Sequence, residues 1–359
     1  IDHGTRHKII PEAPTSGETM KTKMRSRWQG VFLASIVLLG LSFAVCFDAW
    51  AYQVKRVVRG NTSLGTATEV AVLDVSSQLG GVGFDLEKTF LLTKTRIGGT
   101  DDNRRIFLGG QVEDATNLIF SRNTSTTTIY LEYQAVEFVS GVQVQSGMTT
   151  IGEASTTKVI TLPLDAPADR SFPLLSWRAF SDQATSNDDL NMFAADMTGT
   201  RQLTLRRSGV RAGCNNDFVY QVVTFDRDVR VQKGSVTFGT SDNTATVNLN
   251  NAPTYYPCVP SKSFVMVYYL AHVNAAGYEG RWMARAEITD ANTLTFSRGY
   301  TGTADIVYWY LVEFQNEALV KQSSVSYGSG STGSTILIPD SDSLDLSRSF
   351  ATASWTAQT

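Results

Sequence analysis

The sequence predicts an all-β chain made of tandem antiparallel β-sandwich domains, three complete and one truncated. Apolar and polar residues alternate within short segments, which is the period of a strand with one buried face. Clusters of turn-forming residues separate these segments at intervals of about 8 to 12 residues, as in sandwich folds. After residue 51, no segment places its apolar residues at the spacing of a helix.

Three short motifs recur in the same order and define the domains. The first motif, a basic residue, a hydroxyl residue and phenylalanine, begins at Lys88, Arg170, Lys262 and Arg348. The second motif, Leu-x-(Phe/Leu)-x-Arg, begins at Leu118, Leu203 and Leu294. The third motif, Val-(Glu/Thr)-Phe, ends at Phe138, Phe225 and Phe314. The fourth repeat contains only the first motif, so we expect that it cannot close a core of its own and that the chain is incomplete.

Short segments that open the repeats set the domain boundaries. They begin at residues 57, 144, 231 and 320, which gives periods of 87, 87 and 89 residues. Such periods exceed the roughly 20 to 50 residues of solenoid repeats, so each repeat is expected to be a small domain. In the first three repeats, the opening segment is interpreted as a short strand that ends in a turn at Gly60, Gly147 or Gly234. The predicted domains span 52–143, 144–230, 231–319 and 320–359.

The strand that leads into the Val-(Glu/Thr)-Phe motif shows which face is buried. In the first repeat one face of this strand carries Leu131, Tyr133 and Ala135. The same face is apolar in the other two repeats, so it is expected to pack on a core. The opposite face changes from Glu132 to Val219 to Tyr308 between repeats, and it is expected to be a surface under little constraint.

Residues 20–51 have the features of a secretory signal peptide. The 19 residues before Met20 are expected to lie upstream of the translation start and to be unstructured. Basic residues follow Met20, an apolar stretch covers 31–45, and Ala49-Trp50-Ala51 supplies a cleavage site. The apolar stretch is shorter than the roughly 20 residues of a membrane span. The sequence therefore predicts a secreted or cell-surface protein with no membrane span after cleavage; the alternative is a retained signal anchor.

The charge of the expected mature chain disfavours nucleic-acid binding. Residues 52–359 contain 25 Lys and Arg against 30 Asp and Glu, which gives a formal net charge of −5. Both signs are scattered along the chain, whereas nucleic-acid-binding proteins concentrate basic residues on one face.

Few residues of the expected mature chain suit catalysis. His272 is its only histidine, so it contains neither a histidine metal cluster nor a Ser-His-Asp arrangement, and His272 is expected to be an ordinary loop-edge residue. Glu137 and Glu313 occupy matching positions, but the second repeat has Thr224 there. A shared catalytic pair of carboxylates would not tolerate this change. The glutamates are expected to face water or to pair with a basic neighbour, and the chain is predicted not to be an enzyme.

Two cysteines, Cys214 and Cys258, remain after residue 51. An oxidising compartment favours a disulfide between them, and closing this loop would contribute on the order of 4 kcal/mol. The alternative is two separate thiols. Neither their spacing nor their neighbours indicate a zinc site.

Acidic clusters make weak extracellular calcium binding a candidate, although no metal ligand is assigned. The clusters are Asp101-Asp102-Asn103, Asn187-Asp188-Asp189 and Asp340-Ser341-Asp342. None of them has the spacing of an EF-hand loop. Asp and Asn are also common turn residues, so the clusters are equally typical of ordinary loops.

The order of the segments resembles the H-type lectin module, a secreted β-sandwich. A Phe-bearing strand comes first, followed by a loop and a strand near Arg105 or Arg281. The Leu-x-Phe strand follows, and a strand centred on Tyr133 or Trp309 comes last. The resemblance covers the layout of each repeat and matches no binding motif. It implies the sandwich fold, glycan binding and an oligomer, because modules of this family bind sugars and often form trimers or hexamers.

The candidate ligand-binding residues lie in and near loops that vary between repeats. These loops cover about 96–105, 178–190 and 271–281, and variable loops on a repeated scaffold often carry recognition. Exposed aromatic rings stack on sugars, and arginines flank these loops. The candidates are Arg105, Tyr256, Tyr278, Arg281 and Trp282. The alternative is that the aromatic residues, with Tyr255, cover the core of their own domain.

Together these features predict a secreted repeat protein that binds glycan or another cell-surface ligand. Linked weak sites gain avidity by factors of roughly 10² to 10⁴ when the geometry allows simultaneous binding. The main alternative is a set of structural spacers in a surface fibre, with no ligand. Dry apolar junctions between modules would favour spacers, whereas polar junctions and solvent-facing aromatic loops would favour binding. A glycoside-active enzyme is the third alternative.

Overall fold

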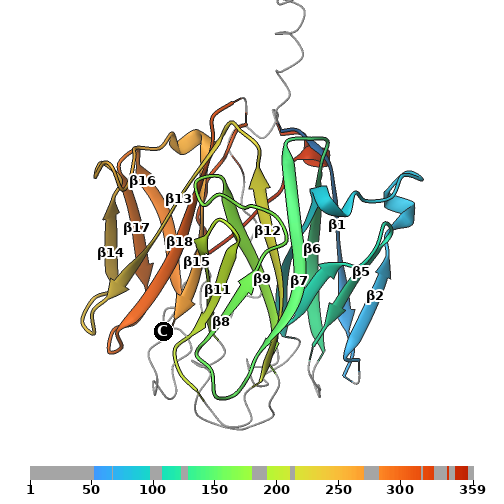
Figure 1. The fold of residues 1–359 in the computed structure, drawn as a ribbon, viewed down its shortest axis with the longest axis horizontal. Helices are drawn as coiled ribbons and strands as arrows, with labels where there is room; N and C mark the ends of the chain where they lie inside the picture. Colours follow the sequence, from blue (N-terminus) through green and yellow to red (C-terminus); the bar gives the residue numbers. More distant parts are fainter. Residues whose placement is uncertain are drawn as a thin grey trace, which may run out of the picture. The chain divides into compact units, whose positions relative to one another are not determined.

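The computed structural model describes residues 52–66, 68–97, 107–122, 128–179, 192–210, 215–270, 283–316, 318–326, 338 and 344–354 (Figure 1). The fold class is confirmed as all-β, and no α-helix occurs in these ranges. All of the described residues belong to one compact unit. The signal peptide predicted over 20–51 lies outside the described residues.

The described ranges contain eighteen strands, which fall into three consecutive sets of six, one set for each complete repeat. The first repeat contains β1 (Val54–Leu64), β2 (Val70–Asp74), β3 (Thr89–Ile97), β4 (Gly109–Val112), β5 (Asn117–Ser121) and β6 (Ile129–Phe138). The second contains β7 (Val142–Ile151), β8 (Thr157–Thr161), β9 (Ser171–Ala179), β10 (Phe193–Gly199), β11 (Gln202–Arg207) and β12 (Asn216–Phe225). The third contains β13 (Val229–Phe238), β14 (Thr244–Asn248), β15 (Ser263–Leu270), β16 (Ala284–Asp290), β17 (Thr293–Arg298) and β18 (Asp305–Phe314).

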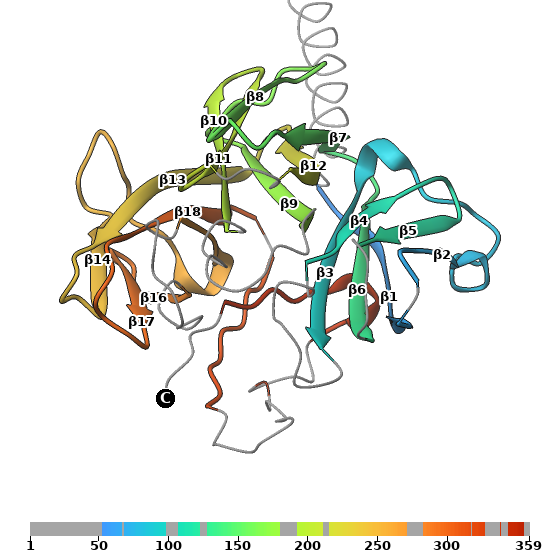
Figure 2. The same ribbon diagram turned by 90° about the horizontal axis from the view of Figure 1, so that it is seen from below.

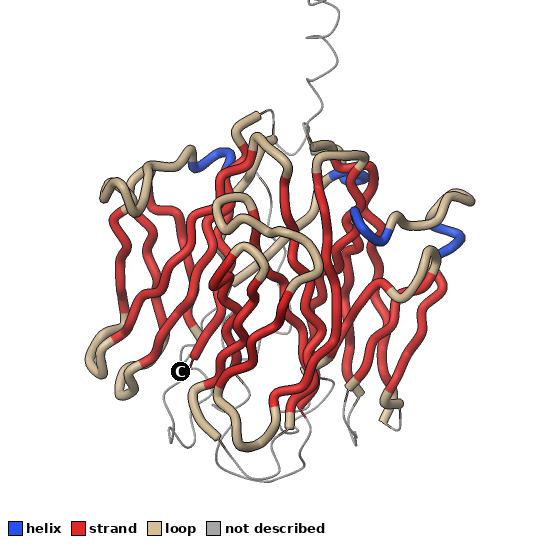
Figure 3. The backbone as a smooth tube through the Cα atoms, in the orientation of Figure 1, coloured by secondary structure: helices blue, strands red, loops and turns tan. Residues whose placement is uncertain are grey.

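Each set of six strands forms two three-stranded antiparallel sheets with the same connectivity (Figure 2). In the first repeat the strand orders are β1-β6-β3 and β2-β5-β4, and the other two repeats follow the same pattern. The register is also repeated, since Phe90, Phe172 and Phe264 pair with Val136, Val223 and Val312. Short 3₁₀ turns precede two of the Phe-bearing strands, η2 (Leu86–Lys88) and η5 (Pro260–Lys262), as Figure 3 shows in blue.

The predicted core faces are buried. Leu131, Tyr133 and Ala135 of β6 are at most 4% exposed and contact Leu118 and Phe120 of β5 in the opposite sheet. In the third repeat, Trp309 of β18 lies in a corresponding cluster with residues of β16 and β17. In the first and third repeats, apolar side chains of both sheets therefore lie in a common buried cluster. Burial of apolar surface is the main stabilising contribution available to a small β domain.

The opening strands do not end at glycine, so that prediction was wrong. β1, β7 and β13 continue for several residues past Gly60, Gly147 and Gly234. At Gly60, an added Cβ would lie 2.5 Å from the hydroxyl oxygen of Tyr133 on the neighbouring strand. The glycines are thus needed because an aromatic ring of the last strand lies directly over them, and not because the chain turns there.

The arginine of the Leu-x-(Phe/Leu)-x-Arg motif has the same role in all three repeats. Arg122, Arg207 and Arg298 are each at most 4% exposed. Their Nε atoms donate to the carbonyl oxygens of Thr68, Ser155 and Asp242 at 2.8, 2.7 and 2.8 Å. These carbonyls belong to the connections between the first two strands of each repeat. The arginine therefore fixes that connection to the core, which explains its repetition.

A shared aromatic core joins the three repeats. Phe225 of β12 lies within 5.7 to 6.2 Å, between ring centroids, of rings from the first, second and third repeats. The rings that contact it are Tyr52, Phe138, Phe172 and Phe314. They belong to one cluster of buried residues that extends through all three repeats. The junctions between repeats are therefore dry and apolar in this cluster.

The same packing corrects the prediction of an unconstrained opposite face on the last strand. Glu132 is exposed, but Val219 is 4% exposed, and Tyr308 is half-buried against the shared core. Gln221 of this face is also buried and forms two hydrogen bonds with the backbone of Leu91 in the first repeat, at 2.8 and 3.1 Å. Sequence alternation indicates one buried face per strand, whereas a neighbouring repeat buries the second.

The fourth repeat differs from the complete ones. Residues 320–323 were predicted as its opening strand, but they form no strand. The predicted hairpin around 328–335 lies outside the described residues. Residues 344–354 are described, and they contain the 3₁₀ turn η8 (Leu346–Arg348) followed by a segment without strand pairing.

Candidate binding site

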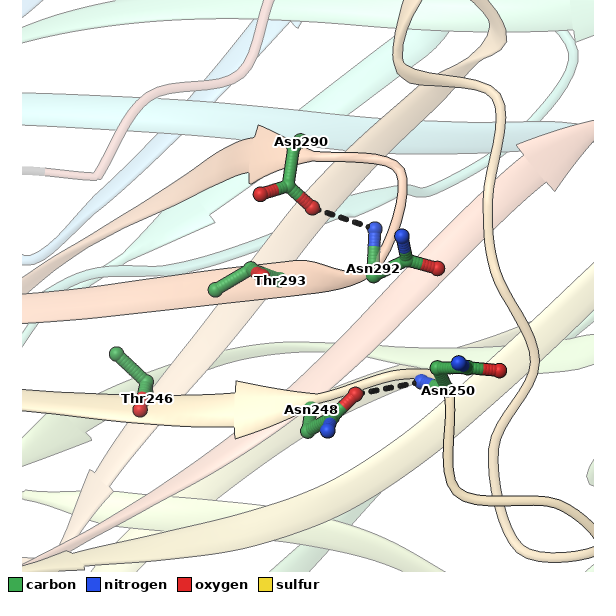
Figure 4. Close-up of a pocket in the computed structure, with 6 residues that line it drawn as sticks. All are labelled: Thr246, Asn248, Asn250, Asp290, Asn292 and Thr293. Carbon is green, nitrogen blue, oxygen red and sulfur yellow. Dashed lines mark hydrogen bonds between the residues drawn. The ribbon is translucent and has the colours of Figure 1, made fainter.

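A shallow polar hollow of about 390 Å³ lies on the third repeat, where β14 ends beside the turn between β16 and β17 (Figure 4). It is lined by Thr246, Asn248, Asn250, Asp290, Asn292 and Thr293. The antiparallel register places Asn248 opposite Thr293 and so brings the two ends together. All six side chains are hydroxyls, amides or a carboxylate, which are the groups that recognise polyhydroxylated ligands through hydrogen bonds.

Two of the six side chains, those of Asn248 and Asp290, stabilise the turns that form the hollow. The Asn248 side-chain oxygen accepts a hydrogen bond from the Asn250 N–H at 2.8 Å, and Asp290 accepts one from the Asn292 N–H at 2.7 Å. Such bonds stabilise turns after a strand. The side chains of Thr246, Asn250, Asn292 and Thr293, by contrast, form no hydrogen bond with any described residue. These side chains are therefore available to a ligand.

The corresponding places in the other repeats have different chemistry. In the first repeat, Asp114 accepts hydrogen bonds from the side chains of Thr116 and Asn117 at 3.3 and 2.8 Å, so these groups are already used. Hydrogen bonds from Ser76 and Asn117 are the largest causes that lower the pKa values of Asp74 and Asp114, respectively. In the second repeat, Gly199 occupies the position of Asp290 and has no side chain that could form a hydrogen bond with a ligand.

The paired glutamates do not face water, so that half of the prediction was wrong. Glu137 is 0% exposed and accepts from Lys55 at 2.8 Å and Arg56 at 2.6 Å. Glu313 is 5% exposed and forms an ion pair with Arg230. Pairing with a basic neighbour is confirmed for both residues.

The second repeat replaces this ion pair by a neutral contact. Its Thr224 lies 3.0 Å, oxygen to oxygen, from Ser171. Since the two glutamates are engaged with cations in separate repeats, neither is placed as the partner of the other in a glycosidase pair, whose carboxyl groups flank one bond.

Tyr256 is the one predicted ligand-binding residue that the structure describes. It is 45% exposed, and its ring centre lies 5.7 Å from the guanidinium carbon of Arg230. In the first repeat, Phe84 contacts Arg56 in the same way at 5.5 Å. The ring thus covers the arginine that pairs with Glu313, which favours the structural alternative for Tyr256. Tyr255 also contacts the core, with its ring 5.3 Å from that of Trp309.

Arg105, Tyr278, Arg281 and Trp282 lie outside the described residues, so their role stays a prediction. The residues that follow the three variable loops are described. Phe107 and Met283 pack against Met192, which is 5% exposed. The three loops therefore enter the described structure at one common cluster, although they are far apart in the sequence.

Cys258 is a buried cysteine in the core of the third repeat, at 3% exposure, and it forms no disulfide with any described residue. Burial raises the pKa of the Cys258 thiol, and the carboxylate of Glu313 adds to the effect. Cys214 lies outside the described residues, so the disulfide stays a prediction.

Cys258 is expected to resist alkylation in the native protein at pH 8, because only the thiolate reacts and a raised pKa keeps the thiol protonated. Iodoacetamide labelling followed by peptide mass spectrometry, with and without denaturant, measures this. Rapid labelling of the native protein would contradict the burial. A disulfide-linked peptide in the unreduced sample would instead identify a pair with Cys214.

The calcium candidates at 101–103, 187–189 and 340–342 lie outside the described residues. Within the described ranges, no three His, Cys, Asp or Glu side chains are grouped so as to hold a metal ion. No helix in those ranges has the length and apolar character needed to cross a membrane.

The six residues of the hollow were not among the predicted site residues. Their signal in the sequence is a pair of Asn- and Asp-containing turns, which are indistinguishable from ordinary loops until strand pairing brings them together. Comparison with protein-family models, with curated proteins and with solved structures finds no match for this chain.

Proposed function

We propose that this chain is a secreted, glycan-binding attachment protein built from antiparallel β-sandwich repeats. The observation that carries the proposal is the polar hollow of the third repeat, with four side chains that have no hydrogen-bond partner among the described residues. An exposed set of hydroxyl and amide groups suits a sugar, whose hydroxyl groups both donate and accept hydrogen bonds. The resemblance to the H-type lectin module supports the same ligand class.

The shared core affects how such a protein would bind. Because the repeats pack on common aromatic residues, they hold their sheets in one rigid arrangement and do not behave as separate domains joined by flexible linkers. A rigid arrangement loses little conformational entropy when it binds. The three variable loops are proposed to supply further contacts, because the described residues that follow them, Phe107, Met192 and Met283, pack together.

A glycan array is expected to identify a ligand for the wild-type chain, and Asn292→Ala combined with Thr293→Val is expected to weaken it about tenfold. Each substitution removes side-chain hydrogen bonds, worth about 0.5–1.5 kcal/mol apiece. Gln202→Ala is the matched control, since Gln202 occupies the position of Thr293 in the second repeat. Equal losses from both variants, or no array signal from the wild type, would contradict the proposal.

The alternative function, a structural spacer in a surface fibre, is favoured by a different observation. The junctions between repeats contain the buried rings around Phe225, which is the dry contact expected of stacked spacers. A spacer needs no ligand. This function therefore predicts that the chain binds no sugar on a glycan array and that chains associate end to end at high concentration. Electron microscopy of the concentrated protein distinguishes the two functions.

A further inference from the structure

Residues 344–354, the only described part of the fourth repeat besides 320–326 and 338, lie against the first and third repeats. Arg348 Nε donates to the carbonyl oxygen of Val54, the first residue of β1, at 2.9 Å. The Ala286 N–H donates to Ser354 Oγ at 3.1 Å in the third repeat. The ring of Phe350 packs edge-on against Phe90 and Phe264, with centroids at 5.7 and 6.1 Å.

This segment adopts the conformation that starts the Phe-bearing strand in the first and third repeats. Asp345 accepts from the Ser347 N–H at 2.9 Å, as Asp85 accepts from the Glu87 N–H at 3.2 Å. Ser349 has φ −112° and ψ 144°, close to the −127° and 145° of Ser263. The fourth repeat thus begins a Phe-bearing strand in its usual geometry.

One edge of this strand is occupied by a glutamine, as in the first repeat. Gln134 donates to and accepts from the backbone of Ala351, both at 3.0 Å. Gln221 bonds the backbone of Leu91 in the same two-way manner. Leu91 follows Phe90 as Ala351 follows Phe350, so the two contacts are equivalent.

The other edge of the strand is open. Backbone groups of successive residues in a strand point to opposite sides, so Phe350 and Thr352 turn theirs away from Gln134. In the described part of the chain, the N–H and C=O groups of Phe350 and Thr352 form no hydrogen bond. The equivalent edge of β3 pairs with β6, the last strand of its own repeat.

Among the described residues, no phenylalanine of a last strand packs tilted beside Phe350. In the complete repeats the two Phe rings are tilted at 34 to 36° with centroids 6.0 to 6.2 Å apart. These pairs are Phe90–Phe138, Phe172–Phe225 and Phe264–Phe314. The strands β6, β12 and β18 already pair on both edges, so none of them can pair with the fourth repeat.

The residue five positions before the phenylalanine determines which last strand fits. The N–H of Asp85 donates to Glu137 at 3.1 Å, and the N–H of Val259 donates to Glu313 at 3.2 Å. The second repeat has Pro167 at this position, which has no N–H, and its last strand has Thr224 in place of glutamate. Asp345 of the fourth repeat has an N–H, and it forms no hydrogen bond with any described residue.

We infer that residues 345–354 form an acceptor edge for a polypeptide segment of last-strand type that ends in Val-Glu-Phe. The segment adds as an antiparallel strand to Phe350 and Thr352, its phenylalanine packs on Phe350, and its glutamate accepts the Asp345 N–H. Strand addition to an open sheet edge is an established mode of peptide recognition, in which the backbone gives affinity and the side chains give selectivity. The inference does not depend on a glycan ligand.

The probe is a synthetic peptide with the sequence of Ile129–Phe138, labelled at its N-terminus and added to the full-length chain. Fluorescence anisotropy measures its binding, and hydrogen–deuterium exchange reports where it binds. The peptide is expected to saturate and to slow exchange in residues 344–354. A peptide with Val136→Pro, which cannot pair as a strand, is expected to do neither.

Two further variants test the selectivity. The peptide substitution Glu137→Thr is expected to weaken binding about tenfold to the wild-type chain, because it removes a charge-assisted hydrogen bond. This penalty is expected to disappear in the Asp345→Pro chain, since proline suits the φ of −78° at Asp345 and removes its N–H together with the carboxylate that accepts from the Ser347 N–H. The Asp345→Ala chain loses the same carboxylate but keeps the N–H, and it is expected to retain the penalty. The Asp345→Asn chain retains the N–H and is expected to behave as the wild type.

Several results would overturn the inference. One is unchanged exchange in 344–354 at saturating peptide, and another is equal binding of the Val136→Pro peptide. A Glu137→Thr peptide that binds the wild-type chain as tightly as the parent would overturn the selectivity for glutamate. A glycan array without signal would leave this inference intact, so the two proposals fail separately.

Discussion

Substitution Phe225→Ala is expected to destabilise all three repeats at once, by about 3–5 kcal/mol. Phe225 is 1% exposed and contacts rings from each of the three repeats. Removing a buried phenylalanine loses the transfer free energy of the ring and leaves a cavity that the surroundings fill incompletely. Chemical denaturation measures the total loss, and hydrogen exchange measures where it falls. Exchange is expected to rise in β6, β12 and β18 together.

The matched control is Phe120→Ala in the first repeat. Phe120 is 0% exposed, but it belongs to a separate cluster formed only by the first repeat. Its loss is expected to be of similar size and to raise exchange first in β2, β4 and β5. If Phe225→Ala affects only the second repeat, the repeats are independent domains and the shared core contributes little.

Substitution Glu137→Ala is expected to lower the free energy of unfolding by about 2–3 kcal/mol. Glu137 is fully buried, and its removal leaves Lys55 and Arg56 without their carboxylate and the Asp85 N–H without an acceptor. Loss of one partner of a buried ion pair typically costs about 3–5 kcal/mol. We expect less here because Lys55 and Arg56 are 37% and 17% exposed and regain some hydration.

The second repeat provides the control for this substitution. Thr224→Ala removes one neutral hydrogen bond and is expected to cost only about 1 kcal/mol. The double substitution Arg56→Gln with Glu137→Thr copies the Gln143 and Thr224 of the second repeat, and it is expected to cost less than Glu137→Ala alone. A double variant that is less stable than Glu137→Ala would show that the ion pair contributes net stability rather than only avoiding an unpaired charge.

Structural features that depend on a single strand or a single repeat could be predicted from the sequence. Alternation predicts the burial of Leu131, Tyr133 and Ala135, and the structure confirms it. The recurrence of the motifs also predicts the matching order of six strands in each repeat. These features are local, because side-chain alternation follows directly from the geometry of a single strand.

Structural features that depend on contact between repeats could not be predicted from the sequence. The burial of Val219 and Gln221 depends on the first repeat, and nothing in their own strand indicates it. The interpretation of Gly147 as a turn was wrong for the same reason, since the ring of Tyr220 lies over it across a strand pair. The polar hollow likewise exists only because pairing places Asn248 opposite Thr293.

The shared aromatic core has a consequence for synthesis of the chain. Phe138 emerges from the ribosome well before Phe314, and the intervening chain takes roughly 9–35 s to make at about 5–20 residues per second. Until the later repeats have been made, Phe90 and Phe138 can contact each other but lack their contacts with the rings of those repeats. The nascent first repeat therefore exposes an aggregation-prone aromatic surface for many seconds. The yield of folded protein in cells is expected to depend on chaperones that bind exposed apolar surfaces.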